Sequence, residues 1–229
     1  MTTESSAERP TRRRQPFEVR GPISIRQLEA IAGSAFAVVI VTSVVAWNGE
    51  VPGWEAELLR FFNDWPDWLE PIMWVLQQVG VLAGPVIGGL VIVWFTRRWE
   101  YLLPFVLLVP LKLIIEKAVL KQLIERERPF VTVGPDINVR GPAFEGLSFP
   151  SGHTTTAFAF GILVFALLPR RWRPIPLIWA AVVGIARLYF GEHNVLDVVA
   201  GAALGTIFAT GLWFTILNRL VRTASEIPA

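Results

Sequence analysis

Six apolar segments constrain this chain more than any other feature of its sequence. A bilayer core about 30 Å thick needs roughly 20 apolar residues in a helix to cross it. The segments are residues 27–47, 71–96, 100–120, 153–169, 174–190 and 195–217. Any one of them can be the core helix of a soluble protein, but six in a chain of 229 residues favour a membrane protein. We therefore expect an all-α fold, built as a bundle of six transmembrane helices.

Composition agrees with this class and excludes several kinds of chemistry. Charged residues make up 17% of the chain, whereas soluble domains carry about 25%. The chain contains no cysteine, which excludes disulfides, thiol catalysis and zinc–thiolate sites. The net charge of +2 comes without a basic stripe along one face, so we expect no nucleic-acid partner. The first apolar run starts too late and is too long for a cleavable signal peptide.

Arginine clusters orient the expected bundle. They lie before the first segment, between the second and third, between the fourth and fifth, and after the last, so with six spans all fall on one side. The positive-inside rule makes that side cytoplasmic. These arginines are Arg9, Arg12, Arg13, Arg14, Arg20, Arg26, Arg97, Arg98, Arg170, Arg171, Arg173, Arg219 and Arg222. We expect a multi-pass plasma-membrane protein with both termini cytoplasmic: a disordered basic tail over 1–26, a membrane domain over 27–220 and a short tail over 221–229.

The first loop on the opposite side is acidic and carries apolar residues at helical spacing. These are Trp54, Leu58, Phe61, Phe62, Trp65 and Leu69. The pattern predicts a short amphipathic helix in the outer membrane interface, with its tryptophans at headgroup depth. A simple anchor is the favoured interpretation, ahead of a substrate gate.

Two sets of glycines four residues apart predict close helix packing. Small residues at this spacing let two helix backbones approach each other. The sets are Gly80, Gly84 and Gly88 in the second segment, and Gly201 and Gly205 in the sixth.

Basic residues on the outer side run against the positive-inside rule and therefore need a local reason. The first group lies in "KQLIERERP", residues 121–129. On a helix, Lys121 and Arg128 share one face about 10.5 Å apart along the axis, and Pro129 marks the helix end. Two cations converging there suit an anion larger than a carboxylate. From this stretch alone, snorkelling at the membrane boundary is the favoured interpretation.

A second group, "PSGH" at residues 150–153, opens the fourth segment. The N-terminus of a helix is a ready anion site because its amides lack partners and its dipole is positive. Ser151 can cap the helix or donate to a phosphate oxygen, and Gly152 allows close approach to the backbone. His153 can donate a proton there. The alternative is an ordinary serine cap beside an interfacial histidine.

The third group is "RLYFGEHNVLDVVAG", residues 187–201. His193 and Asp197 are four residues apart, so the carboxylate can fix the imidazole tautomer and keep the other ring nitrogen available as a nucleophile. Asp197 can instead cap the sixth helix together with Asn194. Glu192 is ambiguous and can simply be solvated. All three groups fall on the outer side, and they contain both histidines of the chain.

Taken together, the three groups strongly resemble the type 2 phosphatidic acid phosphatase superfamily of membrane lipid phosphatases. Its signature reads KxxxxxxRP, PSGH and SRxxxxxHxxxD, and this chain has "KQLIERERP", "PSGH" and "ARLYFGEHNVLD" between residues 121 and 197. The one departure is Ala186 in place of the usual serine. That serine usually helps to bind phosphate, and losing one hydrogen bond costs about 0.5–1.5 kcal/mol, so we expect a weaker or retuned enzyme.

The resemblance implies a role for each matching residue. His193 would be the nucleophile that forms a phosphohistidine, Asp197 would orient it, and His153 would protonate the leaving lipid oxygen. The implied phosphate-binding residues are Lys121, Arg128, Ser151, Gly152 and Arg187. Water would then release the phosphate, with no metal or other cofactor required.

The expected function is therefore hydrolysis of a lipid phosphate or diphosphate at the outer leaflet. Polyprenyl diphosphate, phosphatidic acid and phosphatidylglycerol phosphate are all substrates within such a family, and the loop over residues 130–149, with Arg140, can shape the choice. Alternatives are phosphotransfer to another lipid and a transporter or scaffold without chemistry. Lys112 and Glu116, four residues apart in the third segment, are expected to pair with each other.

Overall fold

The computed structural model describes residues 24–141 and 146–217, and these are folded entirely into helices and loops, without a strand. The predicted tails at 1–23 and 218–229 lie outside the described residues. Helix α1 (Ile25–Ala46) begins two residues before the expected boundary. Ser24 sets this start, because its side chain accepts a hydrogen bond from the Gln27 amide in a capping box.

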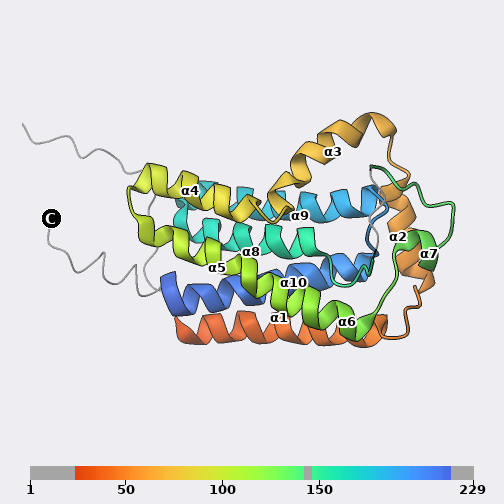
Figure 1. Cartoon of the computed structure of the whole chain (residues 1–229), viewed down its shortest axis with the longest axis horizontal. Coiled ribbons are helices and arrows are strands. Elements are labelled where there is room, and N and C mark those ends of the chain that lie inside the picture. Colours follow the sequence, from red (N-terminus) through yellow and green to blue (C-terminus); the bar gives the residue numbers. More distant parts are fainter. Residues whose placement is uncertain (1–23, 142–145, 218–229) are drawn as a thin grey trace, which may run out of the picture.

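Four long helices lie side by side and form the body of the molecule (Figure 1). Helix α8 (Gly152–Leu167) lies between α9 (Pro174–Tyr189) and α10 (Val195–Leu212), and α10 packs on α1. A π-helical turn (Trp213–Leu217) continues α10. The core between them holds large apolar side chains that are almost fully buried, among them Phe105, Leu163 and Phe208.

The third predicted segment is one helical stretch that changes type along its length. A 3-10 turn (Trp99–Leu102) leads into α5 (Leu103–Lys112), a π-helical stretch (Leu113–Leu120) and α6 (Lys121–Ile124). The predicted pair within it is confirmed, because Lys112 Nζ lies 3.5 Å from Glu116 Oε2.

The second predicted segment is broken. Helix α3 (Glu70–Leu76) and a 3-10 turn (Gln77–Gly80) are separated from α4 (Gly84–Thr96) by a bend of 72°. Pro85 occupies the first turn of α4 and disfavours helical geometry in the residue before it. Within the described part of the chain, Ile25–Ala46 and Val195–Ile216 are long and apolar enough to cross a membrane alone, and the bent pair makes a third if it counts as one span.

Short helices cover one end of the body. They are α2 (Gly53–Asn63), a 3-10 turn (Asp67–Leu69) and α7 (Pro129–Thr132), and in Figure 1 they lie where α8 and α10 begin. The predicted amphipathic helix corresponds to α2, with Trp54 and Phe61 exposed. Its inner face, however, carries Glu55 and Asn63, both fully buried. The helix is thus bound to the body through polar residues as well as apolar ones.

The predicted glycine contacts are confirmed for α10. A Cβ at Gly201 would lie 2.6 Å from the Ser151 carbonyl oxygen, and one at Gly205 would meet the Thr155 carbonyl. In the second segment, Gly80 packs on the His153 backbone and Gly88 on a ring of α8, whereas Gly84 meets only its own segment at the bend. Helix α8 is therefore held closely from two sides near its N-terminus.

Replacing Gly201 by alanine tests this packing. The added methyl group meets a backbone oxygen that cannot rotate away, so we expect a loss of about 1–3 kcal/mol in stability. The matched control is Gly211→Ala in the same helix, where nothing lies within 4 Å of the added group. Thermal unfolding of both variants in detergent, followed by tryptophan fluorescence, should show a lower Tm for Gly201→Ala alone. Equal Tm values would contradict the close contact.

Candidate active site

The three motifs meet at the end of the body covered by α2. Lys121 Nζ donates hydrogen bonds to the carbonyls of Leu147 (2.9 Å), Ser148 (3.3 Å) and Pro150 (3.1 Å), which ties the first motif to the second. Arg128 Nη1 donates to the Glu192 carbonyl at 2.8 Å, which ties the first motif to the third. Residues far apart in the sequence are thus brought together by side-chain-to-backbone contacts.

The second motif forms the N-terminus of α8. The Ser151 amide donates to the Asp197 carbonyl at 2.9 Å, so the starts of α8 and α10 are joined directly. The Ser151 hydroxyl accepts from Thr154 Oγ1 at 3.0 Å and can still donate. A Cβ at Gly152 would lie 2.6 Å from Glu116 Oε1, so a larger residue there would displace the end of that side chain. His153 follows in the first turn of α8 and is half-buried.

His193 lies on the loop between α9 and α10, and its side chain is only 4% exposed. Its Nδ1 is 3.7 Å from Asp197 Oδ2, which is slightly too long for a hydrogen bond. Burial holds the pKa of His193 well below its ordinary value, and the positive charge of nearby Arg187 lowers it further. The imidazole is therefore neutral at physiological pH, which is the protonation state that a nucleophile requires.

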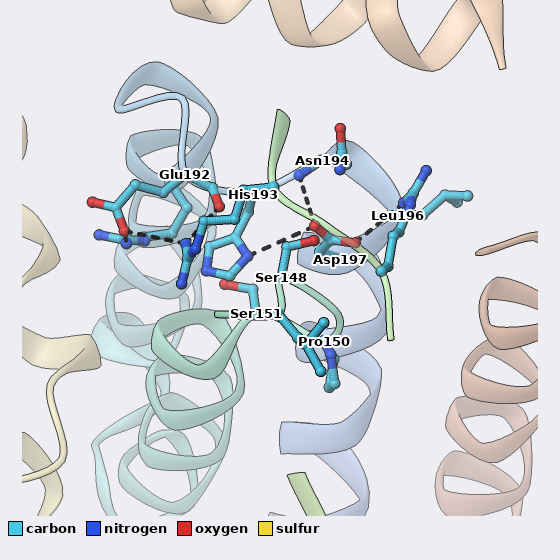
Figure 2. A network of polar contacts seen from close by, with 12 residues as sticks. Ser148, Pro150, Ser151, Glu192, His193, Asn194, Leu196 and Asp197 are labelled. Atoms are coloured by element: carbon cyan, nitrogen blue, oxygen red, sulfur yellow. Dashed lines mark hydrogen bonds and ion pairs between the residues drawn. The ribbon is translucent and has the colours of Figure 1, made fainter. Parts of the chain in front are cut away.

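Of the two roles weighed for Asp197, the structure shows the helix cap, and it places the carboxylate beside His193 without a hydrogen bond. Its Oδ2 accepts from the Asn194 amide at 2.7 Å and completes a capping box at the start of α10. The same oxygen faces His193 Nδ1, and Figure 2 shows both contacts converging on this carboxylate. The cap therefore positions the carboxylate against the imidazole.

Sequence reasoning missed the buried ion pair between Arg126 and Glu55, which contacts the side of Asp197 that faces away from His193. Arg126, with no exposed surface, binds Asp197 Oδ1 at 3.1 Å and Glu55 through two contacts at 3.0 and 2.7 Å. Glu55 Oε1 also accepts from the Leu196 amide at 2.8 Å, so α2 helps to cap α10. The signal was present in the spacing of Glu55, Leu59 and Asn63, which share one face of α2 and are all buried.

The role of Glu192 was left open by the sequence, and the structure excludes a solvated side chain. Its side chain is 4% exposed and forms an ion pair with Arg187, and its Oε2 lies 3.8 Å from Arg128 Nη1. Arg187 also donates to Gln77 Oε1, which comes from the bend of the second segment. The hydropathy pattern places Glu192 in a loop and Gln77 inside an apolar segment, so it gives no sign of this contact.

Arg140, expected to help choose the substrate, has its side chain occupied by structural contacts. It donates to the carbonyls of Asn63 (2.7 Å) and Tyr189 (2.8 Å) and to Asp67 (2.9 Å), and it stacks on the Tyr189 ring. Ala186 is fully buried in an apolar cluster that also contains Met73 and Phe190. In residues 24–141 and 146–217 no group of His, Asp or Glu is arranged to hold a metal ion.

Comparison with known proteins points to one family. The profile of the PAP2 superfamily matches residues 101–220. The chain is 31% identical over 164 residues to the bacitracin transport permease protein BcrC of Bacillus licheniformis, covering 69% of this chain and 79% of that protein. It is 28% identical over 193 residues to the lipid A 4'-phosphatase of Bacteroides thetaiotaomicron, covering 76% of this chain and 82% of that protein.

A solved structure shares the fold. The PAP2 type phosphatidylglycerolphosphate phosphatase from Bacillus subtilis superposes with a TM-score of 0.66 at 22% identity. The match covers 86% of this chain and 98% of that one. At this level of identity the likeness establishes the architecture.

The Arg126–Glu55 contact predicts a large stability effect. Glu55→Gln leaves a buried guanidinium with one carboxylate fewer, and breaking a buried ion pair costs about 3–5 kcal/mol. The matched control is Asp136→Asn, which removes the partner of Arg60 from a pair whose side chains are 39% and 57% exposed. Thermal unfolding should show a clear drop in Tm for Glu55→Gln and no measurable change for Asp136→Asn. Similar Tm values for the two variants would contradict the assigned role of Arg126.

Proposed function

The chain belongs to the PAP2 superfamily of phosphatases, and from that premise we propose that it removes phosphate from a lipid phosphate or diphosphate through a phosphohistidine. The observation that carries the proposal is a buried, neutral His193 backed by Asp197, with Arg128 and Arg187 beside it. A nucleophile, its orienting carboxylate and cations for a phosphoryl group are the parts that this reaction needs.

In the first step, His193 Nε2 attacks phosphorus while Asp197 holds the Nδ1 side of the ring. A nitrogen–phosphorus bond forms, the bond from phosphorus to the lipid oxygen breaks, and His153 supplies the proton that this oxygen takes up. In the second step water attacks phosphorus and gives a proton to His153, which restores the acid; the nitrogen–phosphorus bond breaks and inorganic phosphate leaves. The half-buried position of His153 in the first turn of α8 suits the proton donor.

Cations and backbone amides supply the remaining catalysis. Phosphoryl transfer depends mostly on positioning and on stabilising the charge of the transition state. Lys121, Arg128 and Arg187 converge on this end of the body, and the N-terminus of α8 adds the Gly152 amide with Ser151 beside it. In our proposal Arg128, Arg187 and the α8 amides hold the phosphoryl oxygens during transfer, and Lys121 adds positive charge while its hydrogen bonds fix the loop before α8.

We place this site on the extracytoplasmic face of a six-span bundle. The spans are α1, the bent α3–α4 pair, the stretch from Trp99 to Ile124, α8, α9 and α10. The arginine clusters at 97–98 and 170–173 lie in the connections at the end opposite the site (Figure 1). The positive-inside rule then gives the site its orientation.

We propose that the substrate is a polyprenyl diphosphate, phosphatidic acid or phosphatidylglycerol phosphate. Phosphate release from these three lipids by the purified chain, with chelator present, tests the reaction. Activity should persist with chelator and fall at least about 10³-fold in His193→Asn. A matched control, Glu125→Gln, changes an exposed residue close to the first motif and should leave turnover unchanged.

Three results would count against this proposal. Loss of release on adding chelator would contradict the metal-independent step, and full activity in His193→Asn would contradict the nucleophile. Lipid transport retained in His193→Asn, without hydrolysis in either protein, would favour the transporter alternative.

Single cysteines test the orientation, because the chain has none of its own. Val131 in α7 is 67% exposed on the site end, and Arg171 is exposed on the opposite end. In intact cells a membrane-impermeant maleimide should label Val131→Cys and leave Arg171→Cys unlabelled until the membrane is opened. The reverse pattern would place the site in the cytoplasm.

A further inference from the structure

Glu192, the residue directly before the nucleophile, places its carboxylate where a phosphoryl group is expected. The side chain forms an ion pair with Arg187, its Oε2 lies 3.8 Å from Arg128 Nη1, and it is 4% exposed. Figure 2 shows Glu192 beside His193 with the dashed contact to the guanidinium. A carboxylate and a phosphate use the same charge-assisted hydrogen bonds to arginine. The two anions therefore compete for one pair of cations.

The backbone of Glu192 has contacts of its own. Its amide donates to the Arg187 carbonyl at 3.2 Å, and its carbonyl accepts at 2.8 Å from Arg128 Nη1, the atom that also lies nearest its carboxylate. Arg187 likewise has a second partner, since it donates to Gln77 Oε1. The carboxylate can therefore rotate away from the arginines while the backbone and Arg187 remain supported.

The electrostatics make joint occupancy unfavourable. A phosphate monoester brings up to about two negative charges into a site that excludes water, and like charges a few ångströms apart repel strongly there. Asp197 is also anionic, but Arg126 binds it from behind at 3.1 Å. Glu192 is the carboxylate that faces the same arginines as the incoming phosphoryl group.

We propose that Glu192 is an internal competitor for the phosphoryl site. Its carboxylate occupies Arg128 and Arg187 in the free enzyme, leaves when a lipid-anchored phosphoryl group binds, and returns as inorganic phosphate departs. The inference rests on the proposed function in one respect, since it takes these arginines as the phosphoryl-binding groups. It follows that free phosphate, which lacks the binding contributed by a lipid tail, is held weakly and inhibits little.

Binding of inorganic phosphate to the full chain in detergent tests the proposal. Bound ligand raises the Tm according to its Kd, so phosphate titrations followed by thermal unfolding compare wild type with Glu192→Gln. The substitution keeps the shape and removes the charge, and we expect phosphate to bind about tenfold tighter or more. Glu192→Asp, which keeps the charge, should remain a weak binder, and Glu125→Gln should match wild type.

Turnover gives a second readout. Removing a competitor lowers the KM for the lipid and strengthens inhibition by phosphate without raising kcat. If Glu192 instead serves to orient Arg187, Glu192→Gln will raise KM, lower kcat and bind phosphate no tighter, and the proposal is then wrong.

The two proposals can fail separately. Tighter phosphate binding by Glu192→Gln with no hydrolysis of any lipid would uphold the competitor and count against the phosphatase. Hydrolysis by wild type with unchanged phosphate binding in Glu192→Gln would support the phosphatase and count against the competitor.

Discussion

One buried guanidinium connects α2, at one end of the helical body, to the carboxylate that lies beside His193. Arg126 has no exposed surface and is bound by Glu55 and Asp197, so its charge is compensated from two helices. Removing such a group from water is costly, and only well-placed partners offset that cost. Because Asp197 is shared between Arg126, the cap of α10 and His193, the position of the imidazole depends on α2, which lies more than a hundred residues earlier in the chain.

Helix ends provide the second constraint. The site is built where α8 and α10 begin and α9 ends, and the amide of Ser151 joins two of these ends through the Asp197 carbonyl. Glycines at positions 80 and 201 let the neighbouring segments approach the first turn of α8 directly. The amides that we propose bind the phosphoryl group are thus fixed by backbone contacts, which move less than long side chains do.

Local spacing explains which parts could be predicted from the sequence. His193 and Asp197 are four residues apart, and Gly152 and His153 follow one another, so their proximity is encoded within a single turn or loop. Arg126 and Glu55 are 71 residues apart, and Arg187 and Gln77 are 110 residues apart. The periodicity of a sequence does not predict contacts over such separations. Hydropathy also assigns every carboxylate to water, so it cannot foresee one buried by pairing. The break after Gly80 was missed because the segment is long enough and apolar enough on average to be one span, although Gln77 and Gln78 precede the break.

Charge balance links the fold to the proposed chemistry. The described residues at and behind the site include four cations and three carboxylates, namely Lys121, Arg126, Arg128, Arg187, Glu55, Glu192 and Asp197. Without Glu192, the unbalanced positive charge would be larger in a water-poor interior, where uncompensated charge destabilises the folded state. A phosphoryl group brings the missing negative charge only while it is bound. In our proposal the Glu192 carboxylate therefore stabilises the empty site, and it moves away from the arginines when the phosphoryl group of the substrate binds.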